Sequence, residues 1–520
     1  HISSLSDPQF SRDGQWLAYV HTRFDRQSDG YQSAVWLASV HGGRPRQFTA
    51  GEKRDAAPRW SPDGRWLAFV SNRGGEKARA QIYVMATDGG EALRLTDVPN
   101  GAGEPRWSPD GRHLAFVARL DAEERAAEAG QEPPPDADEA DRRARERERR
   151  EVERSDPRVI DRFAYRAETS YFDGRSGHLY VVELDPETGR ARGKPRRLTE
   201  AERDYHDARW LPDGSALLAV AGRKPGEDDL FYHSDLVRVP LDGSPEVLLT
   251  GPDSEDSAPR PSPDGRWIAY LSLPVAELSA ANVEIKLLPA TGQGAEPRVL
   301  TAGLDAHAGD IAWSADSRSV CFLTGRQGRV DLCRVSVDGG PVETLLSAER
   351  EILAYDLSPD GRQAGFVAGT DRAPWDLYVA ALDGSREERL TEVNGAWLAD
   401  RLLADVEDLW FESGDGTRIQ GWLVKPPAFD PAKVYPLVLL IHGGPHGVSG
   451  DEWHWRWNTQ VFAASGYVVA AVNFHGSSSW TNDFARGIQG AWGDKPTADI
   501  LAATDHLLAR GSIDPERMAI

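Results

Sequence analysis

The chain has 520 residues, which is too long for one hydrophobic core, so we expect at least two domains. Its formal net charge of −22 argues against a nucleic-acid partner, because phosphate binding needs clustered lysine and arginine; we interpret the acidity as an aid to solubility. No apolar run reaches the roughly 18 residues that a membrane helix needs, so we expect no membrane partner.

The chain begins at His1 without the basic stretch, apolar segment and cleavage pattern of a secretory signal. The cytoplasm is therefore the default expectation, and a missing N-terminal segment that held a signal is the alternative. Cys321 and Cys333 lie in apolar, strand-like runs, so we expect buried free thiols instead of a disulfide or a metal site. No motif calls for a metal ion or a cofactor.

Seven variants of the sequence Trp-Ser-Pro-Asp-Gly recur along the first three quarters of the chain. Successive copies start 50, 47, 103, 51, 52 and 44 residues apart. Because Pro fixes φ, Asp bonds nearby amides and Gly adopts positive φ, each copy predicts a turn. The copies are Phe10–Gly14, Trp60–Gly64, Trp107–Gly111, Trp210–Gly214, Pro261–Gly265, Trp313–Ser317 and Leu357–Gly361.

Each copy leads into the same series of predicted strands. In the second unit, strands at Trp66–Val70 and Gln81–Met85 precede a third that ends in Leu95-Thr96, an ending that recurs in other units. Three or four short strands in each unit of about 40–50 residues are typical of a β-propeller blade. We therefore predict a seven-bladed β-propeller over residues 1–397.

The long spacing between the third and fourth copies indicates an insertion at residues 120–158 instead of a missing blade. Opposite charges four residues apart, as in Glu139/Arg143, favour a helix over Asp138–Arg154. We expect an exposed helix there, with a lid or an oligomer contact as the alternative, so a homo-oligomer stays open. The more aromatic segment Asp161–Arg166 either rejoins the blade or faces a substrate.

The pattern changes after residue 397. Asp408–Glu412 and Arg418–Val424 predict two strands joined by a turn, and Tyr435–Ile441 is a continuous apolar run typical of a strand buried on both faces. A second buried strand is predicted at Tyr467–Asn473. Strands that alternate with helices favour a parallel, doubly wound sheet over residues 398–520.

Helices are predicted on both sides of the second buried strand. The aromatic stretch Trp453–Ala464 precedes it, and Thr497–Arg510 follows it with regularly spaced apolar residues. Gly511 suits the end of this helix. Met518–Ile520 then predicts the start of another buried strand.

The sequence His442-Gly443-Gly444 directly follows the first buried strand. At this point α/β-hydrolases keep a backbone amide that stabilises the oxyanion of the transition state, and glycine lets the backbone approach the reacting carbonyl. Gly444 is our candidate donor and Gly443 the alternative. A tight turn without chemistry is the competing interpretation, and His442 is interpreted as a turn residue.

The repeat followed by Tyr-Pro-Leu-Val-Leu-Leu-Ile-His-Gly-Gly-Pro-His-Gly at Tyr435–Gly447 resembles the prolyl oligopeptidase family of serine peptidases, and its acylaminoacyl-peptidase branch most. The segments Trp492–Asp499 and Ile513–Ile520 are similar to that family as well. One loop departs from the family pattern Asn-x-Arg-Gly-Ser-x-Gly-Tyr. After Asn473, His475 stands in place of the arginine and Ser479 in place of a glycine.

The resemblance implies a serine nucleophile, a histidine base and an orienting aspartate. In this fold the nucleophile lies in a Gly-x-Ser-x-Gly elbow after the strand that starts at Met518, and residues 1–520 contain no such sequence. We therefore expect the triad after residue 520 and an incomplete hydrolase domain in this chain. His446, His454 and His475 are not expected to replace it.

The resemblance also implies that the propeller admits short peptides and excludes folded proteins. We expect release of N-acylated amino acids from short peptides. A dipeptidyl-peptidase would need propeller carboxylates for a free amine, and the pairs Glu123-Glu124 and Glu387-Glu388 are predicted to be solvated. A non-catalytic propeller scaffold and an esterase on the same hydrolase fold remain the alternatives.

Overall fold

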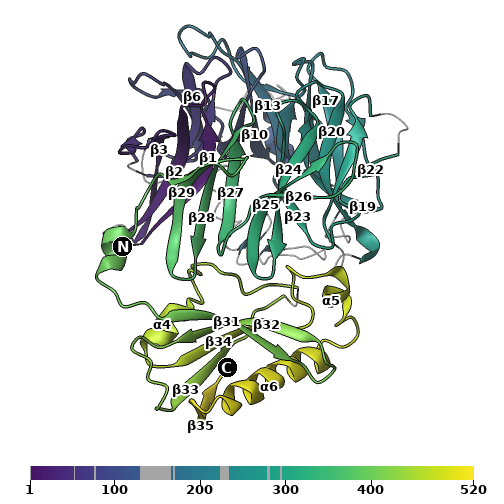
Figure 1. The fold of residues 1–520 in the computed structure, drawn as a ribbon. Helices are drawn as coiled ribbons and strands as arrows, with labels where there is room; N and C mark the ends of the chain where they lie inside the picture. Colours follow the sequence, from purple (N-terminus) through teal and green to yellow (C-terminus); the bar gives the residue numbers. More distant parts are fainter. Residues whose placement is uncertain are drawn as a thin grey trace, which may run out of the picture.

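A computed structural model describes residues 2–520 except positions 28, 52, 75–77, 129–165, 168–169, 172, 223–232, 278–281, 293–295 and 445. The predicted helix at 138–154 and most of the segment at 161–166 lie outside the described residues. Figure 1 shows two bodies, a large assembly of antiparallel sheets above and a smaller mixed sheet with helices below.

Among the described residues, the upper body contains five four-stranded sheets, one eight-stranded sheet and one two-stranded sheet. The four-stranded sheets consist of β1 (Ser3–Phe10), β2 (Trp16–Asp25), β3 (Gly30–Ser39) and β4 (Arg46–Gln47); β5 (Asp55–Trp60), β6 (Trp66–Ser71), β7 (Gln81–Ala86) and β8 (Leu93–Arg94); β9 (Ala102–Trp107), β10 (His113–Leu120), β13 (Ser176–Glu183) and β14 (Arg196–Arg197); β15 (Tyr205–Trp210), β16 (Ala216–Gly222), β17 (Ser234–Pro240) and β18 (Val247–Leu248); and β19 (Ser254–Pro261), β20 (Trp267–Pro274), β21 (Glu284–Pro289) and β22 (Arg298–Val299).

The eight-stranded sheet consists of two sets of four strands, which are joined by the parallel pair Val330 and Glu351. Its strands are β23 (Ala308–Trp313), β24 (Ser319–Arg326), β25 (Arg329–Ser336), β26 (Glu343–Leu346), β27 (Glu351–Leu357), β28 (Gln363–Thr370), β29 (Ala373–Ala381) and β30 (Glu387–Arg389). Short elements complete this body: α1 (Ala122–Glu128), β11 (Arg166–Ala167), β12 (Ser170–Tyr171), a 3-10 turn (Val275–Glu277) and α3 (Gly395–Ala399).

The recurring turn has the chemistry that its sequence predicts. Ser61 Oγ accepts a hydrogen bond from the Trp66 N–H at 2.9 Å, and Asp63 accepts one from the Arg65 N–H at 3.1 Å. Gly64 has a φ of 72°. The turn therefore satisfies its own polar groups while it reverses the chain.

The turn tryptophans connect neighbouring sheets. Each indole N–H donates to the carbonyl of the first strand in the preceding sheet, so every such bond crosses a sheet-to-sheet contact. The pairs are Trp60 to Gln9 (3.1 Å), Trp107 to Arg59 (3.0 Å), Trp210 to Arg106 (2.9 Å) and Trp313 to Arg260 (2.8 Å).

The recurring threonine closes the outer edge of each sheet where it occurs. The threonine lies just beyond the short outer strand, and its hydroxyl accepts a hydrogen bond from a main-chain N–H of the third strand. The pairs are Thr49 with Val35 (3.0 Å), Thr96 with Ile82 (2.9 Å), Thr199 with Leu179 (3.1 Å), Thr250 with Leu236 (2.9 Å), Thr301 with Ile285 (2.9 Å) and Thr391 with Leu377 (2.9 Å).

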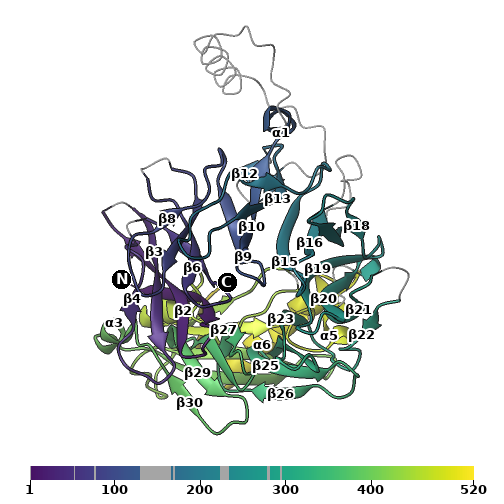
Figure 2. The ribbon, with the colours of Figure 1, turned by 90° about the horizontal axis from the view of Figure 1, so that it is seen from above.

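Figure 2 shows these sheets from above, arranged in a ring. The first and last sheets close the ring, because β1 packs against β27, β28 and β29. The Ser3 N–H donates to Asn394 Oδ1 at 2.8 Å, and the Phe10 N–H donates to Asp356 Oδ2 at 2.7 Å. These bonds join residues from opposite ends of the ring-forming sequence.

The lower body has a sheet ordered β31-β32-β34-β33-β35. Its strands are β31 (Asp405–Glu412), β32 (Arg418–Lys425), β33 (Tyr435–Leu440), β34 (Val468–Asn473) and β35 (Ile513–Ala519). Only β34, β33 and β35 pair in parallel, whereas β31 and β32 form a hairpin antiparallel to β34. Both predictions are confirmed: the short turn at 414–416 joins an antiparallel hairpin, and the strands that alternate with helices pair in parallel.

The helices of this body are α4 (Thr459–Ala464), α5 (Asn482–Arg486) and α6 (Asp494–Ala509). Leu507 of α6 and Ala463 of α4 belong to different apolar clusters against the sheet, as expected for a sheet covered on both faces. The predicted helix at Trp453–Ala464 begins six residues late. The Asn458 side chain accepts a hydrogen bond from the Val461 N–H and so caps the helix at that point.

β35 pairs with β33, as its sequence predicts, but it lies at the edge of the sheet. Met518 and Ile520 are exposed, unlike the buried strand that the sequence predicts, because no further strand among the described residues pairs with β35. Cys321 and Cys333 are buried and free, as predicted. No described helix has the length and apolar character needed to cross a membrane.

Candidate active site

The loop that follows β33 has a conformation that requires glycine. Gly444 has a φ of 139°, and a Cβ added to it would lie 2.5 Å from the backbone nitrogens of His446 and Gly447. Any side chain at this position would therefore force the loop to move. The chain here approaches itself closely, which explains the glycine independently of catalysis.

Two main-chain donors of this loop lack an acceptor in the part of the chain that the structure describes. Among the residues that the structure describes, neither the Gly443 N–H nor the Gly444 N–H has a protein acceptor. Gly443 lines the adjacent cavity, whereas Gly444 lies just outside its wall. Free amides beside a cavity suit the stabilisation of an oxyanion.

His442 fixes the start of the loop. Its Nε2 lies 2.8 Å from Ser477 Oγ, its Nδ1 lies 2.9 Å from the Gly443 carbonyl oxygen, and its ring stacks on Phe474. Burial lowers the pKa of His442 below its ordinary value, which favours the neutral ring. The predicted turn residue therefore also connects the ends of β33 and β34.

His475, the residue that departs from the family pattern, pairs with a buried carboxylate of α6. Asp499 is 1% exposed and accepts hydrogen bonds from His475 N at 2.7 Å and from its ring Nδ1 at 2.8 Å. Ser413 Oγ donates to the other carboxylate oxygen. His475 thus has a structural role in tying the loop after β34 to α6.

The other two histidines of this region bind backbone groups. His446 Nδ1 lies 2.8 Å from the Gly476 carbonyl oxygen, and His454 Nδ1 accepts a hydrogen bond from the Trp457 N–H at 2.9 Å. Both contacts hold loops in place.

A cavity of about 480 Å³ lies between the two bodies, next to His442 and Gly443. Asp371 comes from the upper body, and Trp422, Glu452 and other residues come from the lower one. Burial raises the pKa of both Asp371 and Glu452 above the ordinary carboxyl values. An apolar cavity with two desolvated carboxyl groups can take a peptide-sized ligand.

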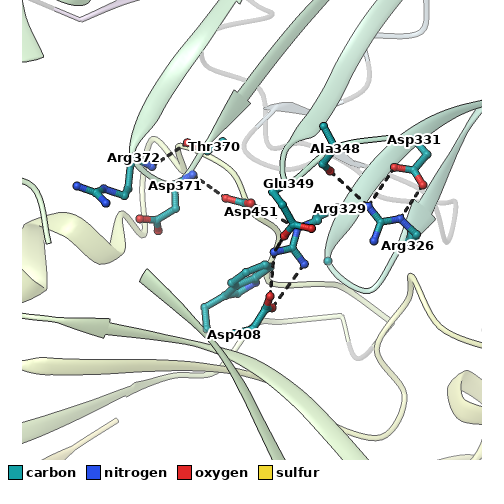
Figure 3. Close-up of polar contacts among 12 residues, drawn as sticks. Arg326, Arg329, Asp331, Ala348, Glu349, Thr370, Asp371, Arg372, Asp408 and Asp451 are labelled. Atoms are coloured by element: carbon teal, nitrogen blue, oxygen red, sulfur yellow. Dashed lines mark hydrogen bonds and ion pairs between the residues drawn. The ribbon is translucent and has the colours of Figure 1, made fainter. Parts of the chain in front are cut away.

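Figure 3 shows polar contacts that join the two bodies beside this cavity. Arg329, on β25, is 8% exposed by side chain; its guanidinium lies 3.0 Å from Asp408 of β31 and also pairs with Glu349. The same guanidinium packs over the ring of Trp422. The Asp371 N–H donates to Asp451 Oδ1 at 3.1 Å, so both contacts cross between the bodies.

The two glutamate pairs singled out in the sequence lie in ion pairs. Glu123 and Glu387 are exposed, as predicted, and Glu387 binds Arg350 at 2.6 Å; Glu124 is instead partly buried and binds Arg175 at 2.9 Å. The sequence did not indicate Asp371 and Glu452. They meet only because a hairpin of the upper body docks on a loop of the lower body.

Comparison with known proteins gives matches to both bodies. A model of the TolB beta propeller domain matches residues 3–131, and a model of the prolyl oligopeptidase family matches residues 453–520. The chain is 30% identical over 537 residues to an uncharacterized peptidase, YuxL, of Bacillus subtilis, covering 100% of this chain and 76% of the relative.

Two further comparisons agree in family and fold. Dipeptidyl-peptidase 5 of Porphyromonas gingivalis is 27% identical over 316 residues, which cover 60% of this chain and 45% of that protein. The acylaminoacyl peptidase of Pyrococcus horikoshii superposes with a TM-score of 0.75 at 20% identity, covering 100% of this chain and 73% of that structure. This last similarity, at 20% identity, shows that the two proteins share a fold.

The sheets together with these matches thus define a peptidase with a β-propeller and an α/β-hydrolase fold. The chain belongs to the prolyl oligopeptidase family.

Proposed function

We propose that this chain is part of a serine peptidase that hydrolyses short peptides and releases N-acylated amino acids from their N-termini. The observation that carries the proposal is the pair of free amides at Gly443 and Gly444 beside the 480 Å³ cavity. One of them, with Gly444 preferred, donates to the oxyanion. Serine, histidine and aspartate supplied after residue 520 perform the chemistry.

The proposed domains are a seven-bladed propeller at residues 1–397, with the insertion at 120–158, and the first part of the hydrolase domain at 398–520. Five four-stranded sheets and an eight-stranded sheet of two halves support seven blades. The propeller lies over the cavity. It therefore admits short peptides and excludes folded proteins. We place the protein in the cytoplasm.

A dipeptidyl-peptidase is the second candidate. Relatives named dipeptidyl-peptidase 5 favour it, and so do Asp371 and Glu452 in the cavity wall, since a carboxylate can bind the free ammonium group of a peptide. In this alternative the same free amides stabilise the oxyanion.

The proposal is tested by treating the full-length protein with a fluorophosphonate probe and by measuring its hydrolysis of three substrates. We expect one labelled serine, and faster hydrolysis of N-acetyl-alanine anilide than of alanyl-alanine anilide or an aryl ester. Preference for the dipeptide anilide would support the second candidate, and preference for the ester would support an esterase. Absence of labelling and turnover would refute a serine peptidase and favour a scaffold.

A further inference from the structure

A second cavity, of about 880 Å³, lies inside the ring of sheets. Its wall contains residues from the first strands and from the Trp-Ser-Pro-Asp-Gly turns, including Trp60, Trp107, Trp210 and Trp313. This cavity is separate from the candidate active site and shares no lining residue with it.

The cavity opens on the side of the ring opposite to the hydrolase. The turns in its wall follow the ends of the first strands. Contacts to the hydrolase come from the other ends: Gly328 in the β24–β25 hairpin binds Ser479, and Asp305, before β23, binds Asn482. The view in Figure 2 therefore looks onto the cavity side.

Four arginines line the cavity at equivalent positions, each directly before the turn. Their side chains are only 17–20% exposed. They are Arg59, Arg106, Arg209 and Arg260. Arg59 has its own carboxylate partner, Asp7, at 2.8 Å.

The other three arginines share one carboxylate. Asp207 lies 2.7 Å from Arg209 and 2.9 Å from Arg260, but 3.9 Å from Arg106. The Nε of Arg106 is buried and, among the described residues, has no hydrogen-bond partner. Three guanidinium groups around one carboxylate leave positive charge uncompensated at this point.

The remaining carboxyl groups near this cluster do not supply the missing partner. Glu104 accepts a hydrogen bond from the Asp207 main-chain N–H at 2.7 Å. Asp356 accepts one from the Phe10 N–H, and burial raises its pKa to about 6. Burial also raises the pKa of Asp310, which lines the same cavity and interacts electrostatically with Arg260 and Arg209.

We propose that this cavity binds the free carboxylate of a short peptide through Arg106, with Arg209 and Arg260 beside it. A guanidinium group matches a carboxylate in two parallel hydrogen bonds, and tryptophan and proline side chains of the turns offer apolar contact to the rest of the peptide. In a chain with a net charge of −22, such a cluster is a local attractive site for an anionic ligand. Inorganic phosphate also presents negatively charged oxygens to the arginines, so it is the competing ligand for this site.

Binding to the full-length protein tests this proposal independently of peptidase activity. The probes are N-acetyl-D-alanyl-D-alanine, whose D-residues resist hydrolysis, the same peptide with a C-terminal amide, and inorganic phosphate. Calorimetric titration should show binding of the carboxylate peptide that weakens with salt, and no binding of the amide. Equal binding of the amide, or binding of phosphate without the peptide, would overturn the proposal.

Substitutions locate the site. Arg106→Met should weaken binding of the carboxylate peptide about tenfold, because it removes a charge-assisted hydrogen bond and leaves Asp207 paired with its two nearer arginines. The control Arg119→Met removes the same charge from a half-exposed side chain outside the cavity and should not change the affinity. Equal affinities of the two variants would refute the site.

Asp207→Asn has the opposite expected effect. It frees guanidinium groups for the ligand, so the carboxylate peptide should bind several-fold more tightly, whereas a merely structural role of the cluster predicts no gain. If Arg106→Met does not fold, Arg106→Lys takes its place and should still weaken binding, since lysine lacks the planar fork. Unchanged affinity in Arg106→Lys and no gain in Asp207→Asn would together overturn the proposal.

Discussion

Gly444 is held in a backbone conformation that other residues rarely adopt, with two backbone nitrogens 2.5 Å from an added Cβ. Gly444→Ala should therefore displace the loop and its free amide. Loss of one oxyanion donor typically costs about 10²–10³ in kcat, and we expect a loss of that size in the full-length protein. Steady-state kinetics with an acyl-amino-acid anilide measure it.

Gly466→Ala is the matched control for this substitution. Gly466 lies in the same body with a φ of 91°, and an added Cβ would have no atom within 4 Å. It should lower stability slightly without changing kcat. Equal kinetics of both variants would show that the amide of Gly444 has no catalytic role.

His178 makes the protein sensitive to acid. It is 0% exposed, and burial together with Arg125 and Arg197 lowers its pKa to about 4. Because the folded pKa lies below the unfolded value of about 6.5, the unfolded chain takes up the proton first, and stability is lost as the pH falls from about 6.5 to about 4.

His178→Gln should remove this contribution. Between pH 7 and pH 4.5 the unfolding free energy of the natural chain should fall by about 1–3 kcal/mol more than that of the variant. Urea titrations at both pH values give the difference. If the unfolding free energies of the two proteins changed equally with pH, His178 would not be the source of the acid sensitivity.

At the scale of the structural element, the turn tryptophans bind the neighbouring sheet through their indole N–H. Trp210→Phe keeps an aromatic ring but leaves the Arg106 carbonyl without its 2.9 Å partner. We expect a loss of about 1–3 kcal/mol in unfolding free energy. Trp492→Phe, at an exposed position, should change it by less than about 0.5 kcal/mol. Similar values for both variants in urea unfolding would refute the inter-sheet bond.

The elements of the sheets were predicted well because each repeat contains its own turn chemistry. Ser61 and Asp63 satisfy local amides, so the turn forms wherever the motif occurs. The helix before β34 was predicted too long, since aromatic residues near Trp453 suit a helix and a packed loop equally. A single side chain, Asn458, determines where that helix starts.

At the scale of the whole molecule, Arg329 joins the propeller to the hydrolase. It pairs with Asp408 and packs over Trp422 across the contact between the two bodies. Arg329→Met should weaken this contact by about 1–3 kcal/mol, because it removes the guanidinium group that pairs with Asp408 across the two bodies. In scanning calorimetry, the unfolding transitions of the two bodies should then have midpoint temperatures further apart than in the natural chain.

Arg372→Met is the control, because Arg372 pairs with Asp405 while both side chains are at least half exposed. Its effect should stay below about 1 kcal/mol. If both variants unfold alike, Arg329 does not hold the two bodies together.

The sequence by itself determined the repeated turns, most of the strands and the glycine loop at Gly443 and Gly444, because these depend on neighbours a few residues away. It did not reveal that Asp371 meets Glu452 in one cavity, or that Arg106, Arg209 and Arg260 surround Asp207. Those groups come from separate bodies or, except for Asp207 and Arg209 on β15, from separate sheets. Only ring closure and docking bring them together. Burial there raises the pKa of Asp371 and Glu452, whereas at Asp207 the effect of burial is outweighed by the arginines, which lower its pKa.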